Sequence, residues 1–165
     1  MTLTQISVQR MSVTSARPFE SVVAAIDAVV SHPDPSRFLR EMGAATTWAA
    51  TETVIGRMLG SSGFMEFVRF DLGAVLRKES GLEGPKIVRL VIGNPLVMKE
   101  MAKHVPETGS YAPVSVLIDE RPDGVHLSYD TMASLLAPYG NAEALEVARE
   151  LDSKVEKLLT EAAGL

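Results

Sequence analysis

The sequence predicts an α+β fold in one domain that spans residues 1–165. We expect a two-layer α/β sandwich, with one mixed sheet of four to five strands, helices on one sheet face and an added helical segment. Segments with strand and helix periods alternate early in the chain. Two strand-like segments then follow one another at 113–130, and the most regular amphipathic helix comes last, at 141–163. A late hairpin favours α+β over a doubly wound parallel sheet.

The N-terminal part of the chain predicts one strand and one helix. Leu3–Val13 contains β-branched residues in partial alternation, and its parity shifts between Val8 and Met11, which allows a bulge. The helix that follows has Pro18 at its first position, where the missing N–H costs nothing. Its apolar residues recur at helical spacing up to His32–Pro35, where two prolines end it.

The segment Pro33–Ser62 is predicted to be a mainly helical insertion. It is rich in alanine, threonine and other small residues, and Gly43 is a place where the helix could divide in two. On one continuous helix, Trp48 and Ile55 share an apolar face, and Glu52 falls between them. We expect Trp48 to be buried against the domain or a partner subunit, with Glu52 at least partly buried beside it.

Strands and helices alternate again in the middle of the chain. Phe64–Phe70 predicts a strand, and 71–81 predicts a short helix with Asp71 as its N-cap. Lys86–Gly93 is too uniformly apolar for a strand with one wet face, so we expect it in the centre of the sheet. The next helix, 94–105, begins at Gly-Asn-Pro.

A hairpin and the final helix complete the predicted fold. The two strands flank Arg-Pro-Asp-Gly, with proline second and glycine last, as a four-residue turn requires. The register that pairs apolar side chains places Ile118 opposite Leu127 and Val116 opposite Tyr129. One or two helical turns then lead into the final helix. Its apolar stripe comprises Leu145, Ala148, Leu151, Val155, Leu158 and Ala162.

Composition and charge exclude several classes of protein. The chain has 165 residues, 46% of them apolar and 22% charged, which supports a folded globular domain. A net charge of −5 with scattered basic residues argues against nucleic acid as a partner. Cysteine is absent, which excludes disulfides and thiolate sites. Because neither a signal-peptide pattern nor a membrane span is visible, we expect a cytoplasmic protein without membrane partners. We also expect no cofactor.

Several segments together carry a family resemblance. They are SARPFESVVAAI, RLVIGNPLVMKEM, YAPVSVLIDE, HLSYD, and LLAPYGN before the final helix. The chain resembles the bacterial and archaeal domain-of-unknown-function family numbered 302 over roughly residues 6–30 and 64–159. The resemblance implies a small two-layer α/β protein that forms a homodimer and has no assigned activity. The segment from about 33 to 62 is longer than in compact members.

Gly93-Asn94-Pro95 is the first candidate site, because it joins the predicted central strand to a helix. Asn is a favoured N-cap and Pro a favoured first helical residue, which explains the motif structurally. The alternative is a helix N-terminus whose free backbone N–H groups bind an anion. The motif lacks the further glycines of a phosphate loop, so the capping role of Asn94 is favoured.

Trp48, Glu52, Tyr111, Tyr129 and Asp130 are further ligand-binding candidates. Glu52 would serve as a proton carrier or polar anchor if it were buried in the apolar stripe. A paired carboxylate at a helix or subunit interface, or a broken helix, is the favoured explanation for Glu52. Tyr111, Tyr129 and Asp130 lie where the chain resembles the family. Tyr129 should face the packed side of the sheet as a core residue with a satisfied hydroxyl.

No metal-binding or nucleophile motif is present in the sequence. Among the histidines, only His104 has a carboxylate at ligand spacing, Glu100 one helical turn earlier, and His126 could complete such a site. A solvated histidine near a helix C-terminus explains His104 more simply. We therefore expect no metal. The sequence identifies no catalytic residues.

The leading functional hypothesis is a non-catalytic module that binds a small apolar or amphipathic molecule. The ligand would lie between the sheet and the inserted helix, and the eight methionines suit an adaptable lining. An enzyme that uses a buried carboxylate or an undetected metal is the first alternative. A homodimeric assembly protein, with the insertion as its interface, is the second.

Overall fold

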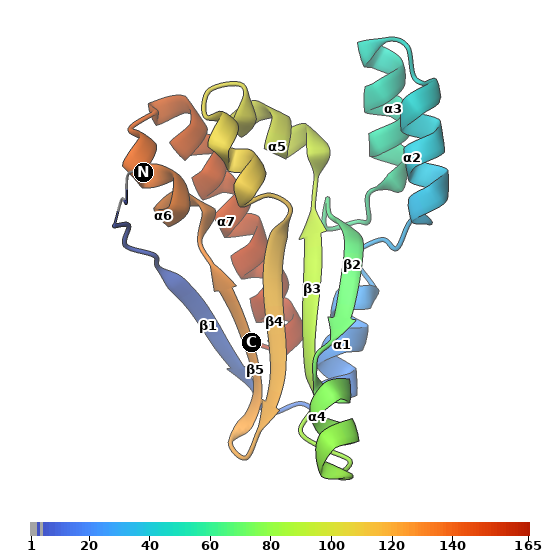
Figure 1. The fold of residues 1–165 in the computed structure, drawn as a ribbon, viewed down its shortest axis with the longest axis vertical. Coiled ribbons are helices and arrows are strands. Elements are labelled where there is room, and N and C mark those ends of the chain that lie inside the picture. The colour runs from blue at the N-terminus through green and yellow to red at the C-terminus, as the bar shows by residue number, and fades with distance from the viewer. Residues whose placement is uncertain (1–2, 4) are drawn as a thin grey trace.

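A computed structural model of the chain describes residue 3 and residues 5–165 (Figure 1). The strands are β1 (Arg10–Ser15), β2 (Met65–Asp71), β3 (Ile87–Gly93), β4 (Val114–Arg121) and β5 (Gly124–Asp130). The α-helices are α1 (Phe19–Asp27), α2 (Pro35–Ala44), α3 (Trp48–Met58), α4 (Gly73–Ser80), α5 (Pro95–Ala102), α6 (Met132–Leu136) and α7 (Ala142–Ala163). Two short 3-10 helices are η1 (Pro106–Ser110) and η2 (Ala137–Tyr139).

The five strands form one sheet in the order β1-β5-β4-β3-β2, and the predicted α+β class is confirmed. Every neighbouring pair in this sheet is antiparallel, so the expected mixture of strand directions is wrong. The reason lies in the first crossover. The chain leaves β1 at one edge, passes through α1, α2 and α3, and enters β2 at the opposite edge, so the two strands never become neighbours.

The main core lies between the sheet and the helices α1, α5 and α7. In Figure 1, α1 and α7 lie behind the strands, so the face toward the reader is open. The predicted hairpin register is confirmed, with Val116 opposite Tyr129 and Ile118 opposite Leu127. All four side chains are buried on the covered face. The stripe on the final helix is buried too, except for Leu145, which is half-buried.

The first strand is shorter than predicted. Strand β1 starts at Arg10, although the expected strand began at Leu3. Residue 4 of that prediction lies outside the described residues, and residue 3 and residues 5–9 are not in a strand. The expected bulge between Val8 and Met11 is wrong, because β1 pairs regularly with β5 from Arg10 onward. The partner strand ends at Asp130, opposite Arg10, so residues before Arg10 have no ladder to join.

The segment predicted as an insertion is helical but is not one helix. Helices α2 and α3 are separated by three residues, and the Thr47 hydroxyl accepts the Ala50 N–H to cap α3. The break rotates the second helix, so the stripe drawn on a continuous helix does not form. Within the chain, Trp48 is 47% exposed and Glu52 is exposed, so their expected burial against the domain is wrong.

A second, smaller apolar cluster attaches α2 and α3 to the rest of the molecule. We call it the hairpin cluster; its buried members are Ile55, Met58 and Met65. Half-buried side chains pack around them: Phe38, Met42, Leu59, Phe67 and Leu96. The cluster therefore lies between the α2–α3 hairpin on one side and β2 and α5 on the other, which agrees with the upper right of Figure 1.

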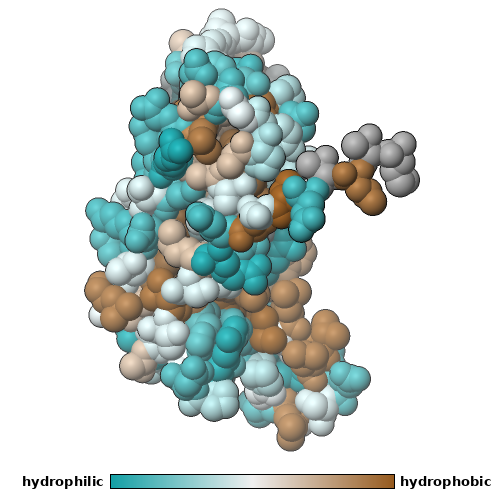
Figure 2. Space-filling model, turned by 90° about the vertical axis from the view of Figure 1, so that its left-hand side faces the viewer, coloured by the Kyte–Doolittle hydropathy of each residue, from teal (hydrophilic) through white to brown (hydrophobic). Residues whose placement is uncertain are grey.

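Helix α4 lies at the far end of β2 from the α2–α3 hairpin (Figure 1). It begins at Gly73, two residues after the predicted N-cap, yet the Asp71 carboxylate still accepts the Ala74 N–H at 2.9 Å. Several apolar side chains there are exposed: Leu72, Val75, Leu76 and Leu82. Figure 2 shows hydrophobic surface gathered at this lower end of the molecule. None of the helices in the described part of the chain has the length and hydrophobicity needed to cross a bilayer.

Candidate functional site

An apolar pocket lies at the end of β3, where the chain turns into α5. Its volume is about 140 Å³, and its wall is formed almost entirely by apolar atoms. Met98 and Met101 of α5, Leu151 of α7 and Phe67 of β2 contribute to this wall. Residues 112–114, just before and at the start of β4, close the remaining side. The pocket therefore lies between the sheet and helices α5 and α7. The sequence led us to expect a ligand between the sheet and the inserted helical segment, and no residue of that segment lines this pocket.

Asn94 lines this pocket, and both ends of its side-chain amide are already bonded within the protein. Its Oδ1 atom accepts the Leu96 N–H at 2.9 Å, which is the predicted capping bond. Its Nδ2 atom donates to the Gly63 carbonyl at 3.1 Å. Pro95 has no N–H, and the Val97 N–H bonds back to the Asn94 carbonyl. The helix N-terminus thus satisfies its own donors, and the anion-binding alternative loses its basis.

The pocket lies at the seam between the two apolar clusters. Met101 and Leu151 belong to the main core, whereas Phe67 packs with the hairpin cluster. The Phe67 ring meets the Phe38 ring of α2 edge to face, with centroids 6.3 Å apart. The α2–α3 hairpin therefore supports one wall of the pocket without entering it.

Trp48 and Glu52 line a neighbouring hollow, which we call the α3 groove. It lies between α3, α5 and α7 and has a volume of about 270 Å³. The Lys99 ammonium sits 4.4 Å from the centre of the Trp48 ring, in cation–π geometry. The groove shares the side chains of Val97 and Leu151 with the apolar pocket, so the two hollows adjoin.

Tyr111, Tyr129 and Asp130 meet at a third hollow, on the uncovered face of the sheet. This open-face hollow has a volume of about 400 Å³. Asp130 is paired there with Arg10 through two hydrogen bonds, which hold the pKa of the Asp130 carboxyl below its ordinary value. The Tyr111 and Tyr139 hydroxyls are 3.1 Å apart, and this bond raises the pKa of Tyr139 to about 12.

Tyr129 is a core residue, as expected, and its hydroxyl is satisfied. It donates to Asp152 of α7 at 2.7 Å and accepts the Met132 N–H. Burial, reinforced by the hydrogen bond to Asp152, raises the pKa of Tyr129. Asp152 also accepts the Met132 and Ala133 N–H groups, so it caps α6 from a distant helix. These bonds attach strand β5 to α6 and α7, so Tyr129 and Asp152 have a structural role.

The weak metal candidates do not form a site. Glu100 pairs with Lys99 and Lys103, which lowers the pKa of Glu100 to about 2. His104 is exposed at the end of α5. His126 lies on the uncovered face of β5 and bonds to Asp123 at 2.9 Å. A sheet strand and a helix C-terminus on the other layer cannot bring these side chains together.

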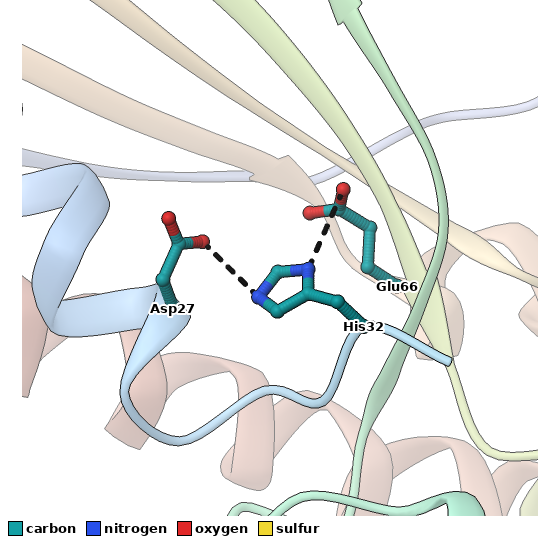
Figure 3. Close-up of side chains that lie close together, drawn as sticks. All are labelled: Asp27, His32 and Glu66. Atoms are coloured by element: carbon teal, nitrogen blue, oxygen red, sulfur yellow. Dashed lines mark ion pairs between the residues drawn. The ribbon is translucent and has the colours of Figure 1, made fainter. Parts of the chain in front are cut away.

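One set of possible metal ligands was missed by sequence reasoning. Asp27, His32 and Glu66 each offer a ligand atom within 4.8 Å of the others, and they are the one such group in the described part of the chain. Figure 3 shows the His32 ring between the two carboxylates. Its Nε2 atom is 3.4 Å from Asp27 Oδ1, and its Nδ1 atom is 3.7 Å from Glu66 Oε1.

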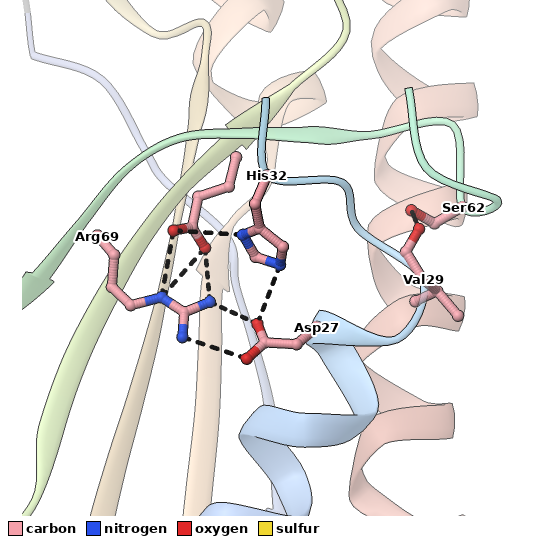
Figure 4. Close-up of polar contacts among 6 residues, drawn as sticks. Asp27, Val29, His32, Ser62 and Arg69 are labelled. Atoms are coloured by element: carbon pink, nitrogen blue, oxygen red, sulfur yellow. Dashed lines mark hydrogen bonds and ion pairs between the residues drawn. The ribbon is translucent and has the colours of Figure 1, made fainter. Parts of the chain in front are cut away.

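Arg69 completes this group, which we call the base network (Figure 4). Its Nη2 atom donates to Asp27 at 2.5 Å and to Glu66 at 2.7 Å. The two carboxylates raise the pKa of Arg69, with the hydrogen bond to Asp27 as the largest cause. The guanidinium already pairs with both carboxylates that a metal ion would bind, so an ion would have to displace it.

The base network stands where the α2–α3 hairpin leaves and rejoins the sheet. His32 is one residue past Ser31, which forms a bridge with Met65 at the start of β2. Nearby, Ser62 donates from both its N–H and its hydroxyl to the Val29 carbonyl (Figure 4). Glu66 is far in sequence from Asp27 and His32, and no residue pattern reveals that this bridge brings it to them.

Comparison with known proteins adds a family and a fold. The family model described as "Domain of unknown function DUF302" matches residues 41–162. That range includes α3 and leaves out β1 and α1. A solved structure, the uncharacterized conserved protein DUF302 from Bacillus stearothermophilus, matches with a TM-score of 0.64. The match covers 93% of this chain and 97% of that one at 12% identity, so it concerns the fold alone. No curated protein matches the chain.

Proposed function

Because the chain belongs to the DUF302 family, whose description names no activity, we propose its function from its own pockets: it binds a small apolar molecule, without catalysis, in the apolar pocket at the end of β3. The supporting observation is an open pocket walled almost wholly by apolar atoms at the seam of the two clusters. A cavity of roughly 150 Å³ accommodates a molecule of about the size of benzene, so the ligand or its buried part is small.

An amphipathic ligand fits the same site. Its apolar end would fill the pocket, and its polar end would reach the adjoining α3 groove past Val97. The groove is lined by two lysines and three glutamates, so its formal charge is −1. That balance favours a neutral or cationic polar end over an anionic one. Met98 and Met101 give the wall side chains that adapt to different shapes.

The absence of available acid–base groups in the pocket supports binding over catalysis. Asn94 is its one polar side chain among the described lining residues, and both ends of that amide are engaged. Glu52 is in the adjoining groove and is exposed, whereas the proton-carrier hypothesis required it to be buried in an apolar stripe. An enzyme that binds a metal at Asp27, His32 and Glu66 is the alternative. Metal analysis of the purified protein distinguishes it, because bound metal in stoichiometric amount would favour the enzyme.

Methyl NMR tests the proposed pocket. We expect toluene to shift the methyl signals of Met98 and Met101, and sodium hexanoate to bind less tightly because of its charge. Ala112→Leu adds apolar atoms to the pocket wall and should weaken toluene binding at least about tenfold. Ala142→Leu, at an exposed position on α7, is the control and should bind as wild type does. Wild-type protein that ignores both probes, or Ala112→Leu that binds normally, would refute the proposal.

Homodimeric assembly is a second candidate, and exposed apolar side chains favour it. Val68 and Phe70 are exposed on the uncovered face of β2, and Val75 and Leu76 are exposed on α4, the next helix in the chain. Val75 is 68% exposed, and large exposed apolar surfaces are uncommon on monomers. Because β2 is an edge strand, a second copy could add to the sheet by a two-fold axis. We propose this surface, rather than the α2–α3 hairpin, as the interface.

Sedimentation of two matched variants tests the interface. Phe70→Asp should convert a dimer to a monomer, because it places a charge in the apolar patch. Leu39→Asp on α2, where the side chain is 70% exposed, should leave the dimer intact. The opposite result would move the interface to the hairpin, as the sequence first suggested. A wild-type monomer at high concentration would remove the assembly proposal.

A further inference from the structure

Two arginines on the uncovered face of the sheet use the same edge of the guanidinium on different partners. Arg10 directs Nε and Nη2 to the two carboxylate oxygens of Asp130, at 2.6 and 2.8 Å. Arg89 directs its Nε and Nη2 atoms to one oxygen, the Ser115 hydroxyl, at 3.1 and 2.7 Å. The Nε–Nη2 edge matches the spacing of a carboxylate or phosphate, so the serine takes a place that an oxyanion fills better.

Arg89 also forms no ion pair with any residue in the described part of the chain. Within the open-face hollow, Arg10 and Asp130 cancel each other, and Arg89 leaves a formal charge of +1. The chain as a whole carries −5. The hollow is therefore a positive spot on an acidic protein, which favours an anionic small molecule over a cationic one.

The surroundings of Arg89 suit a ligand with an apolar part beside its charge. Leu117 and Leu135 contribute apolar wall to the hollow, and Ser128 and Tyr111 contribute hydroxyl groups. Ser128 lies directly opposite Leu117, and Leu117 lies opposite Arg89, so these side chains form one row across three strands. The volume of about 400 Å³ exceeds what an inorganic ion needs.

We propose that the open-face hollow is a second binding site, for a small organic anion that carries a carboxylate or a phosphate monoester on a short apolar group. Arg89 binds the oxyanion through its Nε–Nη2 edge and gives up Ser115. The apolar group lies against Leu117 and Leu135. This site is separate from the apolar pocket, and its occupancy does not depend on that pocket.

Isothermal titration with three probes tests the site. Benzoate and phenyl phosphate represent the two oxyanions, and benzyl alcohol is the neutral control. Wild-type protein should bind at least one of the anions and should not bind benzyl alcohol at this site. The preferred anion identifies which oxyanion the site recognises. Binding should weaken as salt is raised, since one charge pair carries it.

Four variants assign the binding to Arg89. Arg89→Gln should weaken anion binding at least about tenfold, since a charge-assisted bidentate contact is lost. Arg89→Lys keeps the charge but loses the paired donors, so it should fall between Gln and wild type. Ser115→Ala should bind at least as tightly as wild type, because it frees the donor edge. Arg121→Gln, at the far end of β4, should bind as wild type does. All three positions are partly or fully exposed, so the four variants should fold.

Two results would overturn the proposed open-face site. An Arg89→Gln variant that binds the preferred anion as tightly as wild type would overturn the proposal. Wild-type protein that binds neither benzoate nor phenyl phosphate would overturn it as well. Loss of toluene binding in Ala112→Leu with unchanged anion binding would show that the two sites are independent.

Discussion

The main core and the hairpin cluster bury apolar side chains in very different ways. The main core is closed between strands β1, β3, β4 and β5 and helices α1, α5, α6 and α7, and its central side chains, such as Leu127, have no exposed surface. The hairpin cluster has three buried members, Ile55, Met58 and Met65, and is rimmed by half-buried ones. We infer that the first cluster determines whether the protein folds, and the second determines how firmly the α2–α3 hairpin is attached. The apolar pocket lies between these two clusters, so we expect its main-core wall to move less than the wall that the hairpin cluster supports.

The largest expected effect is in the main core. Leu127→Ala removes a fully buried side chain and leaves a cavity, so it should lower the free energy of unfolding by about 2–5 kcal/mol. The loss should appear as a shift of the single denaturation midpoint measured by circular dichroism. Every amide in the sheet should exchange faster by the same factor. A local effect, confined to β5, would mean that the sheet and its helices are not one cooperative unit.

Ile55→Ala makes a similar deletion in the hairpin cluster and should act locally. Hydrogen exchange should become faster in α2 and α3, while exchange in β4 and β5 stays close to wild type. The two clusters are distinguished by this contrast and not by the size of either change. If Ile55→Ala lowered the global midpoint as much as Leu127→Ala does, the hairpin cluster would be part of the main core.

The base network should give the next largest effect. Arg69→Met leaves Glu66, whose side chain is only 12% exposed, without its cation. We expect a loss of about 1–2 kcal/mol, reduced by solvent screening of the partly exposed Arg69. Exchange in α2 and α3 should increase again, because the network stands at their base. Arg57→Met, which breaks an exposed pair with Glu41 inside the hairpin, is the control and should change little.

Asn94→Ala should have a smaller effect that reaches both clusters. The side chain caps α5 of the main core and holds the Gly63 carbonyl at the end of the hairpin. Loss of an N-cap costs about 0.5–2 kcal/mol, measured by chemical denaturation. Asn141→Ala removes the cap of α7 alone and should leave hairpin exchange unchanged. Equal exchange patterns in the two variants would show that the Gly63 contact contributes nothing.

The smallest effect lies outside both clusters, on the uncovered face. The pKa of Asp130 is lowered by Arg10, so the pair contributes stability above the ordinary carboxyl pKa of about 4. This contribution is lost as the pH falls through the lowered pKa of the folded state. Arg10→Gln should raise that pKa, as measured by NMR titration of the Asp130 carboxyl. A titration unchanged in the variant would show that Arg10 does not hold the carboxylate in solution.

Sequence-based prediction was accurate for the main core and less accurate for the α2–α3 hairpin. The register of β4 and β5 was predictable because one register pairs Val116 with Tyr129 and Ile118 with Leu127, which places all four apolar side chains on one sheet face. The final helix was predictable from its apolar stripe, and the Asn94 cap was predictable from the residue types of Asn94 and Pro95. The predicted burial of Trp48 was wrong because it assumed one continuous helix where the protein has α2 and α3. Thr47, a cap residue directly before Trp48, was the available signal of the break.

The candidate sites were predicted less well than the fold, for a physical reason. The base network joins three ligand-type residues through a bridge between Ser31 and Met65, and such a contact follows from the path of the chain rather than any local pattern. Arg89 looked like an ordinary strand residue until its neighbours across the sheet were known. Tyr111 and Asp130 do meet at one hollow, while Tyr129, beside them, uses its hydroxyl inside the core.

The bridge between Ser31 and Met65 has a consequence for how this protein can change over evolution. The ends of the intervening segment are adjacent, and Gly60 lies so close to the Val29 carbonyl that a side chain there would collide with it. A segment whose ends meet can be lengthened, shortened or exchanged without moving the strands that flank it. We therefore expect that residues 33–59 can be exchanged as a unit. Such an exchange would change the support for one wall of the apolar pocket while the sheet stays the same.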